Sequence, residues 1–148
     1  MDYRIYIPRD AIPAFKAKPR SATAAYELNY HFVFRTKWSH RAFQEESRAA
    51  EMVNILKSIG NEKGYMVLGI AVMPEHVHIV LSLTPDIAPS TATRYLKGVS
   101  ARTFHKTFGG SGSLWSNGYS VEAVGKKNVY QVLAYLARQD EHHGTIPG

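Results

Sequence analysis

Residues 71–83 read AVMPEHVHIVLSL, and the alternation within this stretch predicts a β-strand with one buried face. Successive side chains of a strand point to opposite faces of the sheet. The apolar positions that share one face are Val77, Ile79, Leu81 and Leu83. His76 and His78 therefore lie together on the other face, where two imidazoles can form half of a metal site. Two polar residues on a partly exposed strand would give the same pattern.

The segments around this strand predict an α+β fold. The run before it is also apolar, and Pro74-Glu75 between the two runs favours an antiparallel pair joined by a tight turn. Other segments show the periods of two or of 3.6 that are typical of strands and helices. The expected strands are residues 28–35, 65–73, 77–83 and 118–124, and the expected helices are residues 43–59, 90–108 and 128–142.

The order of these elements is β-α-β-β-α-β followed by a helix, the split arrangement that builds a four-stranded antiparallel sheet. Two crossover helices are expected to cover one face of this sheet. The terminal helix is then the only long element left for the face that carries His76 and His78. We therefore expect helices on both faces, with residues 128–142 packed over the histidines.

The 148-residue chain fits a basic amino-terminal arm, residues 1–22, followed by a single domain, residues 23–148. Its 18 Lys and Arg residues against 12 Asp and Glu residues give a formal net charge of +6, which favours a polyanionic partner. The absence of cysteine excludes disulfides, thiolate zinc sites and cysteine nucleophiles. No secretory signal or membrane-length apolar run is found, which predicts a cytoplasmic protein without a membrane partner.

The terminal helix carries Tyr135 and Gln139, four residues apart and therefore neighbours on a helical surface. If the apolar stripe of this helix faces the core, these two residues lie on one flank and Tyr130 lies on the other. A tyrosine can attack a phosphodiester when a metal ion polarises the phosphate. Either tyrosine can also be an amphipathic aromatic residue that packs beside the core.

These segments together resemble the HUH single-tyrosine transposases, the TnpA-like enzymes of the smallest bacterial and archaeal insertion sequences. The resemblance covers most of the chain in five ordered segments and leaves out residues 1 to about 22. The segments are residues 28–35 with Lys37, residues 72–78, residues 96–102, Leu114-Trp115 with Gly118-Tyr119, and residues 135–139.

The resemblance implies that Tyr135 is the nucleophile and that His76, His78 and Gln139 bind a divalent metal, Mg²⁺ or Mn²⁺. It implies a DNA transposase that cleaves and rejoins single-stranded DNA at insertion-sequence ends through a 5′-phosphotyrosine and a free 3′-hydroxyl. No nucleotide cofactor is expected, because the covalent link conserves the bond energy and the sequence has no P-loop motif. The expected partners are DNA hairpins and a second copy of the chain, in a homodimer whose sites combine residues of both chains.

The third metal ligand has a second candidate. His142 follows Gln139 by three residues on the same flank, and a third imidazole would suit zinc better than magnesium. Gln139 is preferred, because two imidazoles and an amide oxygen leave open positions on a hard divalent ion for phosphate oxygens and water.

Five basic residues are expected to contact DNA. Tyr95, Trp115 and Tyr119 lie near them in sequence, and this mixture suits a single-strand groove with stacking platforms. Solvated surface positions would explain any one of the five. The candidates are Arg35, Lys37, Arg94, Lys97 and Arg102.

Three other functions stay open. One is a hairpin-DNA nickase or a domesticated relative with the same site. Another is a non-catalytic single-strand nucleic-acid-binding module on the same fold, which would want aromatic residues where this sequence has His76 and His78. The last is a zinc hydrolase, for which Glu75 and Glu122 are available as bases without a diagnostic spacing.

Overall fold

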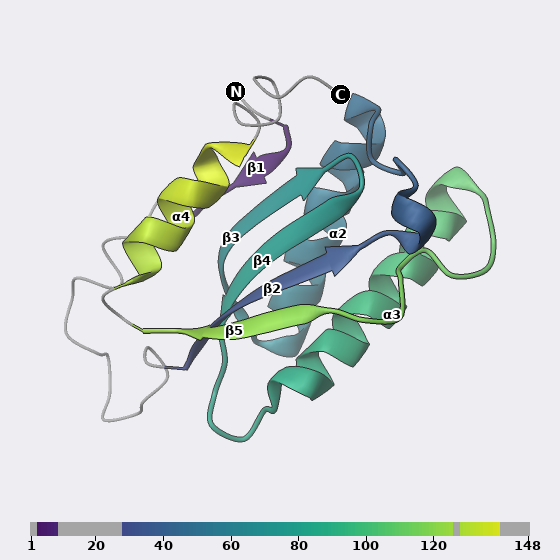
Figure 1. Cartoon of the computed structure of the whole chain (residues 1–148). Helices are drawn as coiled ribbons and strands as arrows, with labels where there is room; N and C mark the ends of the chain where they lie inside the picture. The colour runs from purple at the N-terminus through teal and green to yellow at the C-terminus, as the bar shows by residue number, and fades with distance from the viewer. Residues whose placement is uncertain (1–2, 9–27, 126–127, 140–148) are drawn as a thin grey trace.

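The computed structural model describes residues 3–8, 28–125 and 128–139. Its strands pair antiparallel in one five-stranded sheet of order β1-β3-β4-β2-β5 (Figure 1). The strands are β1 (Ile5–Tyr6), β2 (Asn29–Arg35), β3 (Met66–Met73), β4 (His76–Ser82) and β5 (Ser120–Val124). The helices are η2 (Lys37–Ser39), α2 (Glu46–Lys63), α3 (Pro89–Phe108) and α4 (Val129–Ala137).

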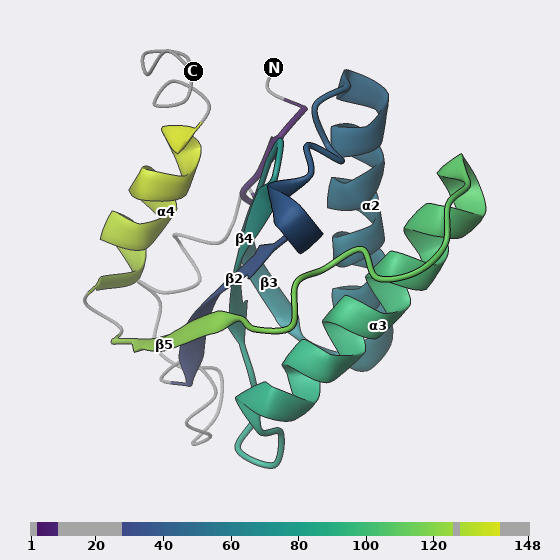
Figure 2. The ribbon, with the colours of Figure 1, turned by 45° about the vertical axis from the view of Figure 1, so that its right-hand side comes forward.

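The α+β fold with helices on both faces of the sheet is confirmed. Figure 2 shows α2 and α3 on one side of the sheet and α4 on the other. The boundaries of the central elements lie close to those expected from the sequence. α4 ends at Ala137, and residues 140–142 of the expected terminal helix lie outside the described ranges.

The expectation of a four-stranded sheet is wrong by one edge strand, because β1 pairs with β3. A two-residue strand is too short to show a period of two, and the basic residues around it are typical of a solvated arm. Arg4 is instead buried, and its guanidinium donates to the backbone oxygens of Phe43 at 2.9 Å and Val72 at 3.0 Å. The first residues of the expected arm are therefore part of the domain, whereas residues 9–22 lie outside the described ranges.

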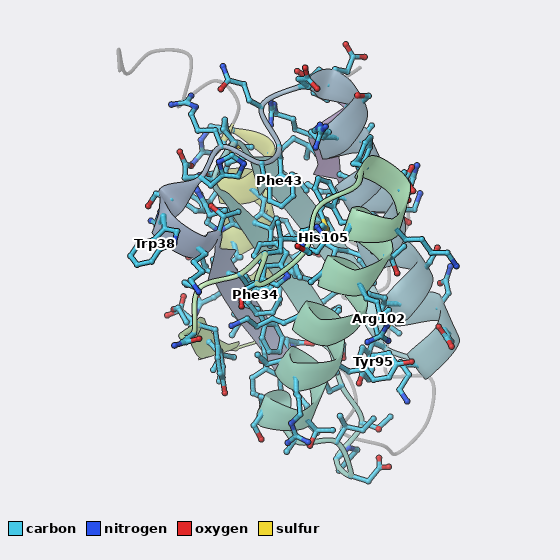
Figure 3. The ribbon with its side chains drawn as sticks, turned by 90° about the vertical axis from the view of Figure 1, so that its right-hand side faces the viewer. Phe34, Trp38, Phe43, Tyr95, Arg102 and His105 are labelled. Atoms are coloured by element: carbon cyan, nitrogen blue, oxygen red, sulfur yellow. The ribbon has the colours of Figure 1, made fainter. Side chains whose placement is uncertain are left out.

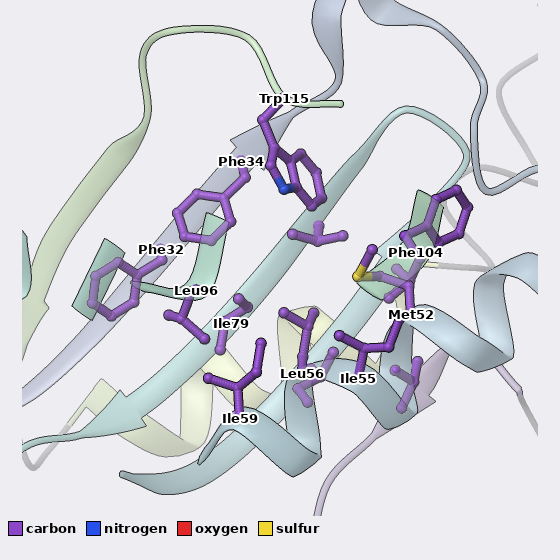
Figure 4. Close-up of a cluster of buried hydrophobic side chains, with 14 of the residues drawn as sticks. Phe32, Phe34, Met52, Ile55, Leu56, Ile59, Ile79, Leu96, Phe104 and Trp115 are labelled. Atoms are coloured by element: carbon purple, nitrogen blue, oxygen red, sulfur yellow. The ribbon is translucent and has the colours of Figure 1, made fainter. Parts of the chain in front are cut away.

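The face of the sheet under α2 and α3 holds the larger apolar cluster (Figure 4). Phe32 and Phe34 of β2 point into it beside Ile79 of β4, because alternate residues of each strand face the same way. The helical stripe expected from the sequence supplies the opposite wall and is buried in full: Ala49, Met52, Val53, Leu56 and Ile59. α2 then ends at Gly64, whose φ of 78° lies in the left-handed region that glycine adopts readily.

The opposite face holds a smaller apolar cluster between α4 and the strands β3 and β4. Val129, Leu133 and Leu136 are its buried residues from α4, and Val80 is its member from β4. Gly69 of β3 lets the helix lie close to the sheet, since a Cβ there would come within 2.7 Å of the Leu133 Cδ2. The expected cover of the histidine face by the terminal helix is therefore confirmed. Among the described helices, none combines the length and apolar character that crossing a bilayer would need.

Candidate active site

His76 and His78 lie on the face of β4 that α4 covers, as their alternation with Val77 and Ile79 predicts. Their exposed fractions are 8% and 5%, and their ring centroids are 4.9 Å apart. In the register with β2, His76 is opposite Arg35 and His78 is opposite Val33. The two imidazoles therefore share one buried position near the end of β2.

α4 brings the tyrosine to this pair within the same chain. The Tyr135 ring meets the His78 ring edge-on, with centroids 5.7 Å apart, while 43% of the residue stays exposed. Gln139 lies just beyond the end of the helix and is 3% exposed. Tyr130, by contrast, is partly buried. A substrate can therefore reach Tyr135 from solvent, whereas Gln139 is buried.

Each histidine of the pair has a polar partner on its Nδ1 atom. The Nδ1 of His76 donates to the Glu75 carboxylate at 2.8 Å. The Nδ1 of His78 lies 3.0 Å from the Nε2 of His31 on β2, and the Nδ1 of His31 lies 3.6 Å from the Glu122 carboxylate on β5. His31 was not among the expected site residues, although it alternates with Phe32 on the polar face of its strand.

Burial lowers the pKa of His78 to about 3, with smaller contributions from the neighbouring His76 and His31, while the Gln139 side chain opposes the shift. Burial also lowers the pKa of His31, and the Glu122 carboxylate opposes this shift. The imidazoles of His78 and His31 are therefore neutral at neutral pH. A neutral imidazole has the lone pair that a metal ion requires.

Two unpaired atoms at the site suit the chemistry of a divalent metal. The Nε2 of His78 and the Nε2 of Gln139 are buried and lack a hydrogen-bond partner among the described residues. Rotation of the Gln139 amide by about 180° would put its oxygen, a ligand for hard cations, in place of that nitrogen. His76, His78 and Gln139 could thus hold Mg²⁺ or Mn²⁺ and leave positions open for a phosphate.

A site of three strong zinc ligands is not found in the described ranges, which contain no group of three His, Cys, Asp or Glu side chains placed to hold a metal. This leaves the glutamine as the third ligand candidate within those ranges. His142, the alternative, lies outside them.

The five expected DNA contacts do not lie together. Arg35 is exposed beside the histidines, and it contributes to the lowered pKa of His78. Lys37 follows on η2, at the rim of a hollow of about 530 Å³ that also includes Trp38. Arg94 and Arg102 line another hollow with Tyr95 on the α2–α3 layer, the layer that Figure 3 faces. The structure therefore separates Arg94 and Arg102 from the histidine face.

Lys97 holds a loop rather than projecting freely from α3. Its Nζ donates to the backbone oxygen of Ser116 at 2.7 Å and to that of Gly118 at 3.1 Å. Tyr119 follows in this loop, is 43% exposed, and lines a hollow of about 220 Å³ together with Arg35. Lys97 thus orders the segment that places an aromatic ring beside an arginine.

Comparison with known proteins agrees with this geometry. Residues 24–139 match the family described as "Transposase IS200 like". The chain is 32% identical over 124 residues to the ISDra2 transposase TnpA of Deinococcus radiodurans, covering 78% of this chain and 86% of that protein. It is 30% identical over 126 residues to the transposase for insertion sequence element IS200 of Salmonella typhimurium, covering 81% of this chain and 82% of that protein.

Two solved structures share the fold. A crystal structure assigned as a transposase of Deinococcus radiodurans has a TM-score of 0.64 and 30% identity, over 83% of this chain and 97% of that one. A REP-associated tyrosine transposase bound to a REP hairpin has a TM-score of 0.64 over 88% of this chain and 76% of that one, and at 15% identity it supports the fold alone. With the family match over most of its length and two relatives at 30% identity or above, this chain belongs to the IS200-like transposase family.

Proposed function

We propose that this transposase cleaves and rejoins single-stranded DNA at insertion-sequence ends with Tyr135 as its nucleophile. The observation that carries the proposal is the meeting of Tyr135 with His78, whose buried Nε2 has no partner among the described residues. An exposed tyrosine beside two buried imidazoles provides both a nucleophile and a metal-binding position.

The proposed reaction exchanges one phosphate ester for another. The Tyr135 oxygen forms a bond to phosphorus and loses its proton to solvent, and the bond from phosphorus to the 3′-oxygen breaks. The departing oxygen takes up a proton to give a 3′-hydroxyl, and the 5′-phosphate stays on the tyrosine. Attack by another 3′-hydroxyl reverses these steps on a new strand, so no nucleotide cofactor is consumed.

His76, His78 and Gln139 are the residues that would hold the divalent ion for this reaction. When bound, a divalent cation supplies Lewis-acid polarisation of the scissile phosphate. Burial keeps His78 unprotonated at neutral pH, and the central strand β4 fixes both histidines in place. α4 fixes the tyrosine through Leu133 and Leu136, which are buried against the sheet.

The proposed DNA path runs along the end of β2. Arg35 and Tyr119 line a hollow beside the histidines, and Trp38 is 87% exposed on the adjoining turn. Arginine can neutralise a phosphate and exposed rings can stack on unpaired bases. The REP-associated transposase of the same fold binds a REP hairpin, and we propose that this chain likewise acts on a single strand that forms hairpins.

The decisive experiment is a gel that detects covalent attachment of the protein to a labelled single strand containing an element end. We expect an adduct with the unmodified protein and with Tyr130→Phe, and none with Tyr135→Phe, which removes one oxygen and keeps the ring. DNA binding should be nearly unchanged in all three proteins. An adduct formed by Tyr135→Phe would refute the assignment, whereas an adduct without strand rejoining would indicate a nickase.

We also propose a homodimer in which each working site takes its histidines from one chain and its tyrosine from the other. A single chain brings His78 and Tyr135 together by itself, so the same contacts of α4 would have to form on a partner's sheet. Mixing His76→Ala with Tyr135→Phe chains tests this, because shared sites restore one working site per mixed dimer. Failure of verified mixed dimers to recover activity would assign the arrangement within one chain.

A further inference from the structure

We propose that His31 and Glu122 form a positioning relay that holds His78 in the tautomer needed to bind metal. The inference rests on the proposed metal-dependent function. It adds His31, which has no role in the sequence analysis, and gives Glu122 a role other than that of a hydrolase base. The relay runs across three adjacent strands, from β5 through β2 to β4.

Strand register places the three residues in a row. His31 is directly opposite Glu122 in the pairing of β2 with β5. On its other side β2 pairs with β4, where His31 is opposite Val80 and thus diagonal to His78. Diagonal neighbours on one sheet face are within reach of ring side chains. The two imidazole planes are inclined by 26°, and their facing nitrogens are 3.0 Å apart.

The charges along this row favour one arrangement of protons. The Glu122 carboxylate, 3.6 Å from the Nδ1 of His31, favours a proton on that nitrogen. The Nε2 of the neutral His31 then has a lone pair that accepts a hydrogen bond from the Nδ1 of His78. With its proton on Nδ1, His78 has a lone pair on Nε2, the buried atom without a partner among the described residues.

His76 is held in the same tautomer by a direct contact with a carboxylate. Its Nδ1 donates directly to the Glu75 carboxylate at 2.8 Å, which leaves its Nε2 as the basic nitrogen. The β4 position of His78 has no carboxylate next to it in sequence, and His31 extends the reach of Glu122 by one ring. A purely space-filling role for His31 would require neither this proton order nor the carboxylate.

The first measurement is the tautomer of His78 in the metal-free protein, read from imidazole ¹⁵N chemical shifts at a pH where the ring is neutral. We expect the Nδ1–H tautomer in the unmodified protein and in His31→Gln, whose side-chain oxygen can also accept a hydrogen bond. His31→Phe should give a mixture of tautomers. Retention of the Nδ1–H tautomer in folded His31→Phe would overturn the proposal.

The second measurement is Mn²⁺ affinity without DNA, by titration calorimetry. Loss of a residue that orients a metal ligand weakens binding by roughly 10- to 100-fold. We expect a loss in this range for His31→Phe, a smaller loss for His31→Gln, and no change for the control His105→Phe on α3. Equal affinity of folded His31→Phe and unmodified protein would also overturn the relay.

Glu122→Gln keeps the test decisive if His31→Phe does not fold, because the Glu122 side chain is 71% exposed and its loss should leave the fold intact. This variant should lower the Nδ1–H fraction of His78 and weaken Mn²⁺ binding, and no change in either would count against the relay. Since both readouts omit DNA, a protein that passes them but forms no covalent adduct would contradict the proposed function alone.

Discussion

The two faces of the central sheet bury different chemistry. Under α2 and α3, alternate residues of β2 and β4 contribute Phe32, Phe34 and Ile79 to a continuous apolar cluster. Under α4, the same two strands contribute His31, His76 and His78, all of which are buried. Burial of apolar area stabilises a fold, whereas burial of polar groups carries a cost that hydrogen bonds or ligands must offset. One face therefore fixes the sheet, and the other uses that rigid sheet to hold reactive groups in place.

Substitution of a histidine on the α4 face should produce the largest effect, and the effect should be on cleavage rather than on stability. His76→Ala or His78→Ala should lower cleavage in Mg²⁺ or Mn²⁺ by more than about 100-fold, the upper range for residues that merely support a ligand. Stability should change little, and an excess of chelator should have the same effect on the unmodified protein. Cleavage rates and urea unfolding of both variants check this. Undiminished cleavage in chelator would make the histidines structural.

The apolar face should show the converse pattern. Phe32→Ala removes a fully buried ring next in sequence to His31 and should lower the free energy of unfolding by about 3–5 kcal/mol. At low temperature, where the variant stays folded, its cleavage rate should lie near that of the unmodified protein. Denaturant unfolding provides the measurement, with Tyr135→Phe as a control that should change stability by less than about 0.5 kcal/mol.

Acid should lower the stability of the metal-free protein because of a buried histidine on the α4 face. The unfolded chain protonates His78 near its ordinary pKa of 6.5, whereas burial keeps the folded residue neutral down to about pH 3. Between these values the unfolded state binds more protons, so stability falls as pH falls, by about 1.4 kcal/mol per pH unit for this residue. Unfolding measured in chelator between pH 7 and 5 should show this slope, and His78→Phe should flatten it. Equal slopes would contradict the buried neutral state.

The smallest expected effect concerns DNA contacts. Affinity for a single strand should fall with salt by roughly 0.7 log units per decade for each phosphate contact. Arg35→Ala should make that slope shallower by about one contact, because Arg35 lies beside the histidines. Arg102→Ala on the α2–α3 layer is the matched control and should leave the slope unchanged. If Arg102→Ala also made the slope shallower, the DNA path would extend to both layers.

Local patterns were enough to predict the histidine face. The period of two around His78 separates it from Val77 and Ile79, and the apolar stripe of α4 shows which side of that helix meets the sheet. The order of elements leaves α4 as the cover. These features lie within single elements or follow from their order, so an unaligned sequence contains them.

Features that depend on register across strands were missed. His31 and His78 are 47 residues apart, and their contact exists only because β2 pairs with β4 in one particular register. β1 was missed since two residues show no period, and because Arg4 resembles a charge of a basic arm until its backbone acceptors are known. The separation of Arg94 and Arg102 from the histidines, however, could have been predicted, as α3 was already expected on the opposite face.

The absent side chain of Gly69 sets the clearance between α4 and the sheet. A methyl group there would come within 2.7 Å of the Leu133 Cδ2 and 3.2 Å of the Leu136 Cδ2, so the two leucines would have to repack or α4 would have to move outward. Tyr135 belongs to the same helix, and any outward movement of α4 would carry it away from His78. Misplacement of a reacting group by about 1 Å can slow a reaction by about 100-fold. A glycine of β3 that touches no site residue thus contributes to the distance between Tyr135 and His78.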